Sequence, residues 1–394
     1  MTDMATGSDT AQLTPFRLDI PESALDDLRR RLADTRWPDQ PAPATPADGG
    51  WRLGPPLDYL RELAEYWRRD YDWRAAEARI NEFPQFTAQI DGQRVHFLHV
   101  RSAEPTARPL ILTHGWPGSI VEYLDLIGPL TDPAAHGGDP ADAFHVVLPS
   151  IPGFGLSGVT TETGWEAARV ARAWAELMRR LGYDRYLAHG GDWGSAITRE
   201  LGLADPEHVA ALHVLQIFAA AVGAQNADLD VPEERRSVEA GRRYRDELAG
   251  YSAIQSTRPQ LMAYALTDSP VAQLAWIVDG FKHWTDSVDV PEDAVDRDAM
   301  LTNVMLYWLT GTAGSSARFY YDGFRGFRQA AGRCTVPTAV AVFPRDISVP
   351  VRRIAEQTNN IVRWTHFDRG GHFASLEEPD LVLADLRESF RPYR

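Results

Sequence analysis

The chain of 394 residues has a single cysteine, Cys334, and therefore cannot form a disulfide bond within itself. A protein without disulfides fits a reducing compartment, and we predict a cytoplasmic location. Its first 15 residues are polar and resemble neither a signal peptide nor a membrane anchor. No run of about 18 apolar residues occurs anywhere, so we expect a soluble protein that does not span a membrane.

Positive charge is also scarce, because 40 basic residues stand against 55 acidic ones and the net charge is −15. A surface this acidic repels phosphate backbones and anionic lipids, so neither nucleic acid nor a membrane surface is expected as a partner. The chain has no cluster of cysteine and histidine residues at the spacing of a zinc site. We therefore expect no metal and no cofactor.

What the sequence does contain is a series of short apolar runs alternating with amphipathic segments. The runs typical of buried strands lie at 110–113, 144–148, 186–189, 209–215, 338–342 and 361–367. The segments with helical periodicity lie at 120–130, 165–181, 195–203 and 377–390. This alternation predicts an α/β fold with a mostly parallel sheet covered by helices on both faces.

The same pattern divides the chain into four segments. Residues 1–105 show an alternating strand pattern at 16–20 and helical periodicity, and lead into a hairpin, which predicts an N-terminal extension. Residues 106–217 and 325–394 carry the two parts of the α/β core. Between them, residues 218–324 interrupt the alternation with helical periodicity and several tyrosines, which predicts a lid over the active site.

A sharp turn between a strand and a helix is indicated by Gly190-Gly-Asp-Trp-Gly-Ser195. The string follows a predicted strand and opens a predicted helix, as the nucleophile elbow of α/β-hydrolases does, and Asp192 stands where serine is usual. An aspartate that only caps the helix would also fit this string. Ser195 then falls in the first turn of the helix.

A second glycine-containing turn, His114-Gly115-Trp116-Pro117, follows the strand at 110–113. Loops at the carboxyl ends of parallel strands build ligand sites. In α/β-hydrolases, a backbone N–H from this loop joins the N–H of the residue after the nucleophile to form an oxyanion hole. The expected donors are therefore Trp116 and Trp193.

The base and its orienting acid are expected near the end of the chain, after the nucleophile. His372 lies in a glycine-rich loop, Gly370-Gly-His-Phe373, that follows a predicted strand. Asp346 directly follows the strand at 338–342. Their rivals are His366, which lies inside a strand, and Asp368, which is only four residues from His372.

An aspartate nucleophile changes the reaction that the site can perform. A carboxylate displaces a leaving group at saturated carbon and forms an alkyl ester, and a histidine can then activate the water that hydrolyses this ester. The two suitable leaving groups are a halide and an epoxide oxygen. An epoxide needs a proton donor, for which tyrosine is suited; the candidates in the insertion are Tyr244, Tyr251, Tyr264, Tyr307, Tyr320 and Tyr321.

Motifs along nearly the whole chain make it resemble the microsomal-type epoxide hydrolases, a branch of the α/β-hydrolase fold. The motifs that carry the resemblance lie at 15–21, 35–38, 114–119, 190–195, 250–259, 268–270, 274–276, 303–308, 316–320, 343–346 and 370–373. The resemblance implies an enzyme that converts a small-molecule epoxide and water to a diol. It also implies that Tyr251 and Tyr320 activate the epoxide oxygen, with Tyr321 as the neighbouring alternative to Tyr320.

Two other functions are compatible with parts of the pattern. A haloalkane dehalogenase would share Asp192, His372 and Asp346, but it would need halide-binding donors in place of the tyrosine pair. A catalytically silent hydrolase fold could serve as a binding module, although such a fold need not keep all three residues. The natural epoxide, the selectivity and the oligomeric state, for which a homodimer is one option, are left open.

Overall fold

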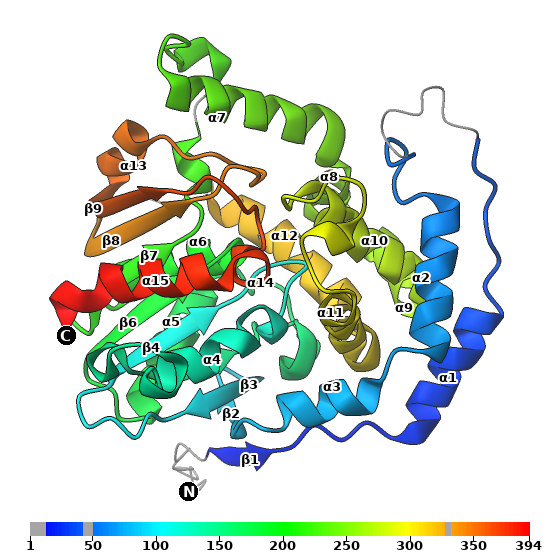
Figure 1. Ribbon diagram of the computed structural model, residues 1–394, viewed down its shortest axis with the longest axis horizontal. Coiled ribbons are helices and arrows are strands. Elements are labelled where there is room, and N and C mark those ends of the chain that lie inside the picture. The colour runs from blue at the N-terminus through cyan, green and yellow to red at the C-terminus, as the bar shows by residue number, and fades with distance from the viewer. Residues whose placement is uncertain (1–12, 42–49, 222, 328–331) are drawn as a thin grey trace, which may run out of the picture.

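One twisted sheet runs through the computed structural model, which describes residues 13–41, 50–221, 223–327 and 332–394 (Figure 1). The strands of the described residues pair in the order β1-β2-β3-β5-β4-β6-β7-β8-β9. Their bounds are β1 (Thr14–Phe16), β2 (Gln85–Ile90), β3 (Gln93–Val100), β4 (Arg108–Thr113), β5 (Phe144–Pro149), β6 (Tyr186–Gly190), β7 (Val209–Val214), β8 (Cys334–Val342) and β9 (Asn359–His366). From β5 to β9 every pairing is parallel, whereas β1, β2 and β3 pair antiparallel.

Helices cover both faces of the sheet, as the alternating pattern predicted. One face carries α5 (Ala167–Arg180) and α6 (Trp193–Ala204), and the other carries α4 (Leu124–Thr131) and α15 (Pro379–Phe390). The central parallel strands are buried on both faces, which explains their continuous apolar runs: each residue of β6 and β7 is buried, whereas the edge strand β9 is largely half-exposed. The predicted α/β fold is confirmed.

Two helical segments lie to one side of the sheet (Figure 1). Between β7 and β8 the chain forms α7 (Pro232–Arg243), α8 (Gly250–Thr257), α9 (Pro259–Asp268), α10 (Pro270–His283), α11 (Arg297–Thr310) and α12 (Ala313–Phe327). Before β2 it forms α1 (Glu22–Ala33), α2 (Leu57–Arg69) and α3 (Trp73–Ile80). We call the helices α7 to α12 the lid. Both α1 and α2 pack against α10, so the N-terminal helices support the lid.

The structure corrects two expectations about elements. The strand predicted at 16–20 ends at Phe16, because the N–H groups of Leu18 and Ile20 bind the side chains of Asn81 and Glu77 instead of a neighbouring strand. The helix predicted at 377–390 is divided into α14 (Ala374–Glu377) and α15. Pro379 stands at the start of α15, where a missing backbone N–H costs nothing.

Candidate active site

The turn between β6 and α6 presents Asp192 at the carboxyl end of the sheet. Asp192 has φ +53° and ψ −125°, one of two positive-φ residues other than glycine in the described part of the chain. Such a backbone conformation costs free energy and persists only where packing enforces it. Close packing requires glycine nearby: a Cβ on Gly194 would overlap the carbonyl oxygen of Thr113, and one on Gly115 would overlap the Asp192 side chain.

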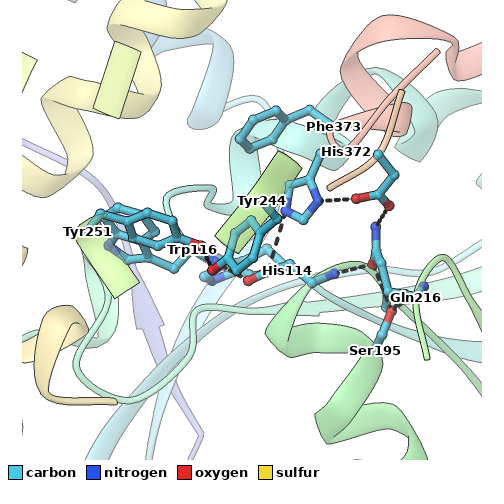
Figure 2. A network of polar contacts seen from close by, with 12 residues as sticks. His114, Trp116, Ser195, Gln216, Tyr244, Tyr251, His372 and Phe373 are labelled. Carbon is cyan, nitrogen blue, oxygen red and sulfur yellow. Dashed lines mark hydrogen bonds and ion pairs between the residues drawn. The ribbon is translucent and has the colours of Figure 1, made fainter. Parts of the chain in front are cut away.

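The two oxygens of the Asp192 carboxyl face different partners. The backbone N–H of Trp116 donates a hydrogen bond of 2.8 Å to Oδ1 (Figure 2). Oδ2 lies 3.4 Å from Nε2 of His372. One oxygen is therefore held by the loop after β4, and the other faces the predicted base.

His372 is oriented on its other side by Asp346. Its Nδ1 lies 2.8 Å from Oδ1 of Asp346, and both residues are buried. The backbone N–H of His372 donates to the carbonyl of Trp284 at 2.7 Å, so a lid residue fixes the loop that carries the imidazole. The structure thus brings together Asp192, His372 and Asp346, which lie far apart in the sequence.

The charge of His372 follows from this arrangement. Burial by itself would lower its pKa, but the carboxylates of Asp346 and Asp192 outweigh burial and raise the pKa from 6.5 to about 10. At neutral pH the free protein therefore holds an imidazolium between two carboxylates. The rivals lie elsewhere: His366 and Asp368 are both exposed.

The two lid tyrosines implied by the resemblance lie close enough to the Asp192 carboxyl for its charge to act on both phenols. The ring of Tyr251, from α8, stacks on the ring of Trp116 with centroids 4.9 Å apart, and Tyr320, from α12, contacts both rings edge-on. Burial raises the pKa of each phenol well above its usual value, and the charge of Asp192 raises it further. Both phenols therefore stay protonated and can donate.

Several residues hold the predicted oxyanion loop, which is the segment 114–119 after β4. His114 contacts the Gly115 carbonyl through Nδ1 at 2.9 Å and accepts the N–H of Ile151 at Nε2, so it is a structural part of the motif. Burial lowers its pKa to about 4, and the ring is neutral. From the lid, Asn303 donates to the carbonyl of Pro117 at 2.7 Å.

Trp193 begins α6 directly after Asp192, and its indole ring lies edge-on to the rings of Phe319 and Tyr320. Its role as the second oxyanion donor stays a prediction. A cavity of about 1150 Å³ lies on the other side of Trp116 and Tyr251, where Trp51, Trp276 and Trp284 line it together with charged side chains such as those of Asp279 and Lys282.

Comparisons with known proteins agree with this geometry. Residues 13–123 match the family model described as epoxide hydrolase N terminus, and residues 108–379 match that of the alpha/beta hydrolase fold. A Stigmatella aurantiaca protein named as a candidate epoxide hydrolase is 48% identical over 383 residues, covering 97% of this chain and 86% of the relative. Epoxide hydrolase 1 of Sus scrofa is 33% identical, covering 95% and 88%. The chain belongs to the microsomal-type epoxide hydrolase family.

A solved epoxide hydrolase has a similar overall structure. The epoxide hydrolase of Aspergillus niger superimposes with a TM-score of 0.85 at 30% identity, over 97% of each chain. Among the residues that our structure describes, no helix of the present chain combines the length and apolarity needed to cross a membrane.

The sequence patterns gave no indication of one polar residue of the site, Gln216. Gln216 follows β7 and joins Asp192 to Asp346: its Oε1 accepts the N–H of Asp192 at 2.5 Å, and its Nε2 donates to Oδ2 of Asp346 at 2.5 Å (Figure 2). Ser195, from the first turn of α6, also donates to Gln216 Oε1, at 3.1 Å. The available signal was its place at the carboxyl end of a parallel strand.

Tyr244 was one of six tyrosines that the sequence could not separate. Its hydroxyl lies 3.1 Å from that of Tyr251, so it extends the tyrosine pair by one more hydroxyl. Tyr307, another of the six, donates to the carbonyl of Gly118 at 2.6 Å and thereby serves the oxyanion loop. Tyr264 is largely exposed on α9.

Proposed function

We propose that this chain is an epoxide hydrolase that opens a small-molecule epoxide to a vicinal diol through an alkyl ester on Asp192. The observation that carries the proposal is the position of one carboxyl between three kinds of group. These are the N–H of Trp116, the His372–Asp346 pair and two buried tyrosines. Each group has a separate task in a two-step displacement.

In the first step, Oδ2 of Asp192 attacks one epoxide carbon, and the carbon–oxygen bond of the ring breaks. The electron pair goes to the epoxide oxygen, which takes a proton from Tyr251 or Tyr320. The tyrosinate then regains its proton at the expense of the His372 imidazolium, which leaves His372 neutral. Ester formation removes the negative charge of Asp192, one of the two carboxylates that raise the pKa of His372, so the imidazole becomes free to act as a base.

In the second step, neutral His372 takes a proton from water, and the resulting hydroxide adds to Cγ of Asp192. The negative charge develops on Oδ1, which already accepts the N–H of Trp116. The intermediate then collapses: the bond from Cγ to the alkyl oxygen breaks, this oxygen takes up the proton that the added hydroxide carried, and the diol leaves. The carboxylate and the imidazolium are restored, so the sum of both steps is epoxide plus water to diol.

The tyrosine pair favours this reaction over haloalkane dehalogenation. A halide leaves as an anion and requires no proton, whereas an alkoxide leaving from carbon does. Two phenols whose pKa is raised well above the usual value remain protonated and suit the second case. A catalytically silent binding module would require neither the pair nor the strained backbone of Asp192. We keep the cytoplasmic location and the homodimer as predictions beside this function.

The first test measures diol formation from a panel of aryl and alkyl epoxides, such as styrene oxide. Wild type should form diol, and Asp192→Ala should form none while its circular dichroism spectrum stays unchanged, because the nucleophile is removed without disturbing the core. Diol formation by a folded Asp192→Ala protein would contradict the nucleophile assignment. Halide release from haloalkanes, with no diol from any epoxide, would favour the dehalogenase.

The second test separates the two steps. In His372→Gln, alkylation should proceed but ester hydrolysis should nearly stop, so the intact mass should increase by the mass of one substrate molecule. The matched control is His366→Gln, which changes an exposed histidine on β9 and should turn over like wild type without an adduct. A folded His372→Gln protein that neither turns over nor gains mass would overturn the two-step mechanism.

A further inference from the structure

A buried glutamine contacts two residues of the proposed machinery, and the proposed mechanism assigns it no task. Gln216 lies two residues after the end of β7, and only 2% of its surface is exposed. Its Oε1 accepts the backbone N–H of Asp192 and its Nε2 donates to Oδ2 of Asp346, each at 2.5 Å (Figure 2). Burying an amide is costly unless its donor and its acceptor both have partners, and here both do.

The two partners determine which way the amide points. A backbone N–H requires an acceptor and a carboxylate requires a donor, so Oε1 faces Asp192 and Nε2 faces Asp346. An amide offers an acceptor and a donor side by side, whereas a carboxylate offers acceptors alone and a thioether offers no donor. The hydroxyl of Ser195 lies 3.1 Å from the same Oε1 and accepts the backbone N–H of Gln216 at 3.2 Å, so it holds the residue from a second side.

The carboxyl of Asp346 needs such an anchor because of where it lies. Asp346 belongs to the loop between β8 and α13 (Arg352–Thr358), so regular secondary structure does not fix its side chain. It also lines a cavity of about 300 Å³. Arginine side chains line the same cavity, namely those of Arg236, Arg243 and Arg345. A carboxylate could turn toward these cations, but the donor on Gln216 holds Oδ2 and thereby keeps Oδ1 on Nδ1 of His372 at 2.8 Å.

The direction of this carboxyl matters most in the second proposed step. In the free protein the carboxylates of Asp346 and Asp192 both contact the imidazolium of His372. Ester formation removes the charge of Asp192, and Asp346 is then the carboxylate that still contacts the ring. Its hydrogen bond keeps the proton on Nδ1, which leaves Nε2 free to take a proton from water.

Resting on the proposed function, we propose that Gln216 is a positioning residue for hydrolysis of the alkyl-enzyme, where its amide holds the Asp346 carboxyl in the direction that orients His372. Alkylation depends on this amide far less, because the attacking carboxyl of Asp192 keeps its contacts with Trp116 and His372. The two steps should therefore respond differently to a change at this position.

The first test is Gln216→Glu, which keeps the acceptor for the N–H of Asp192 but sets a second carboxyl against Asp346. Two adjacent carboxyls share one proton, because repulsion raises the pKa at which the second charge forms. This proton can replace the amide hydrogen at about pH 6, and its loss toward about pH 9 makes the carboxyls repel. The ratio of variant to wild-type rate for hydrolysis of the alkyl-enzyme from styrene oxide should therefore fall about tenfold or more over this range.

Over the same range, the alkylation rate of Gln216→Glu should stay within about threefold of wild type, so the adduct should accumulate in intact-mass spectra at the higher pH. A ratio of hydrolysis rates that is constant with pH would overturn the inference, because a merely structural defect does not titrate.

The second test is Gln216→Met, which removes both the donor and the acceptor at similar size and should slow hydrolysis more than alkylation. Its matched control is Gln273→Met on α10, a site of the same exposure, 2%, whose amide donates to the carbonyl of Val304 at 2.9 Å. Both rates of this control should match wild type. An unchanged hydrolysis rate in Gln216→Met would overturn the inference, as would an equal loss in both steps.

If Gln216→Met does not fold, the pH dependence of Gln216→Glu decides the question by itself. Failure of wild type to form any diol would instead count against the proposed function.

Discussion

At the scale of the single residue, Asp192 is held from three sides, because its N–H and each of its two carboxyl oxygens have a different partner. Its N–H binds Gln216, Oδ1 binds Trp116 and Oδ2 faces His372. The sequence could indicate Asp192 and Trp116 because short strings of glycine around a strand end are local signals. Gln216 carries no such string, and its contacts with Asp192 and Asp346 arise only when segments distant in the sequence meet.

His372 makes the folding stability depend on pH. Its pKa is about 10 in the folded protein against an ordinary value of 6.5, so protonation favours the folded state. The contribution is fully present below about pH 6.5 and is lost as the pH rises through 10. We expect the melting temperature of wild type to exceed that of His372→Gln at pH 6.5, and the difference to shrink toward pH 10.

The measurement is a series of thermal melts of both proteins between pH 6.5 and 10.5. Asp192→Asn serves as a comparison, because it removes one of the carboxylates that raise the pKa of His372, and its stability should begin to decline at a lower pH than that of wild type. A difference between wild type and His372→Gln that is constant across this range would contradict the raised pKa.

At the scale of elements, the proposed chemistry is divided between core and lid. The strand ends of the core carry Asp192, His372 and Asp346, while α8 and α12 of the lid carry Tyr251 and Tyr320. The alternation of apolar runs was sufficient to predict the strands, because parallel strands are buried on both faces. The strand after Phe16 was predicted wrongly because two side chains near α3 satisfy its backbone, which no periodicity can reveal.

The proposed proton donors Tyr251 on α8 and Tyr320 on α12 can be tested singly and together. Tyr251→Phe and Tyr320→Phe should each slow alkylation by about ten- to a hundredfold, and the double variant should nearly stop it, because general-acid assistance to the leaving oxygen is lost. Stopped-flow measurement of the alkylation phase would report this. Tyr321→Phe is the control, since adjacent helix positions point about 100° apart. Normal alkylation by the double variant would mean that the proton donors lie elsewhere.

At the scale of the whole molecule, the N-terminal helices, most of the sheet and the lid share one large apolar cluster, beside a smaller one that includes Val214 and Val340. Buried residues from α2, such as Leu63, belong to the same cluster as those of β4 and α10. The side chains of Arg31 and Asp268 also join α1 to the end of α9. The sequence indicated an extension and an insertion, but their contact through α1, α2 and α10 depends on tertiary packing that a single chain pattern does not encode.

We therefore expect unfolding in a single cooperative transition. Leu63→Ala, at a site 1% exposed, should lower the free energy of unfolding by about 2–5 kcal/mol through the lost burial and the remaining cavity. Urea titration followed by circular dichroism and by tryptophan fluorescence should give coincident curves. Leu261→Ala, on α9 at 64% exposure, is the control and should change the midpoint little. Two separated transitions in wild type would show that the extension unfolds independently.

The aromatic lining of the cavity also has a consequence for how such a protein can diversify. Asp192 and the N–H of Trp116 belong to the core, where neighbouring glycines leave no space for a side chain, as at Gly115 and Gly194. The aromatic lining of the cavity comes largely from the lid and the extension, including Trp51 and Trp276. Descendants of one ancestor could therefore exchange substrates through mutation of the lining while inheriting the reaction intact, and a search for altered selectivity should begin with those positions.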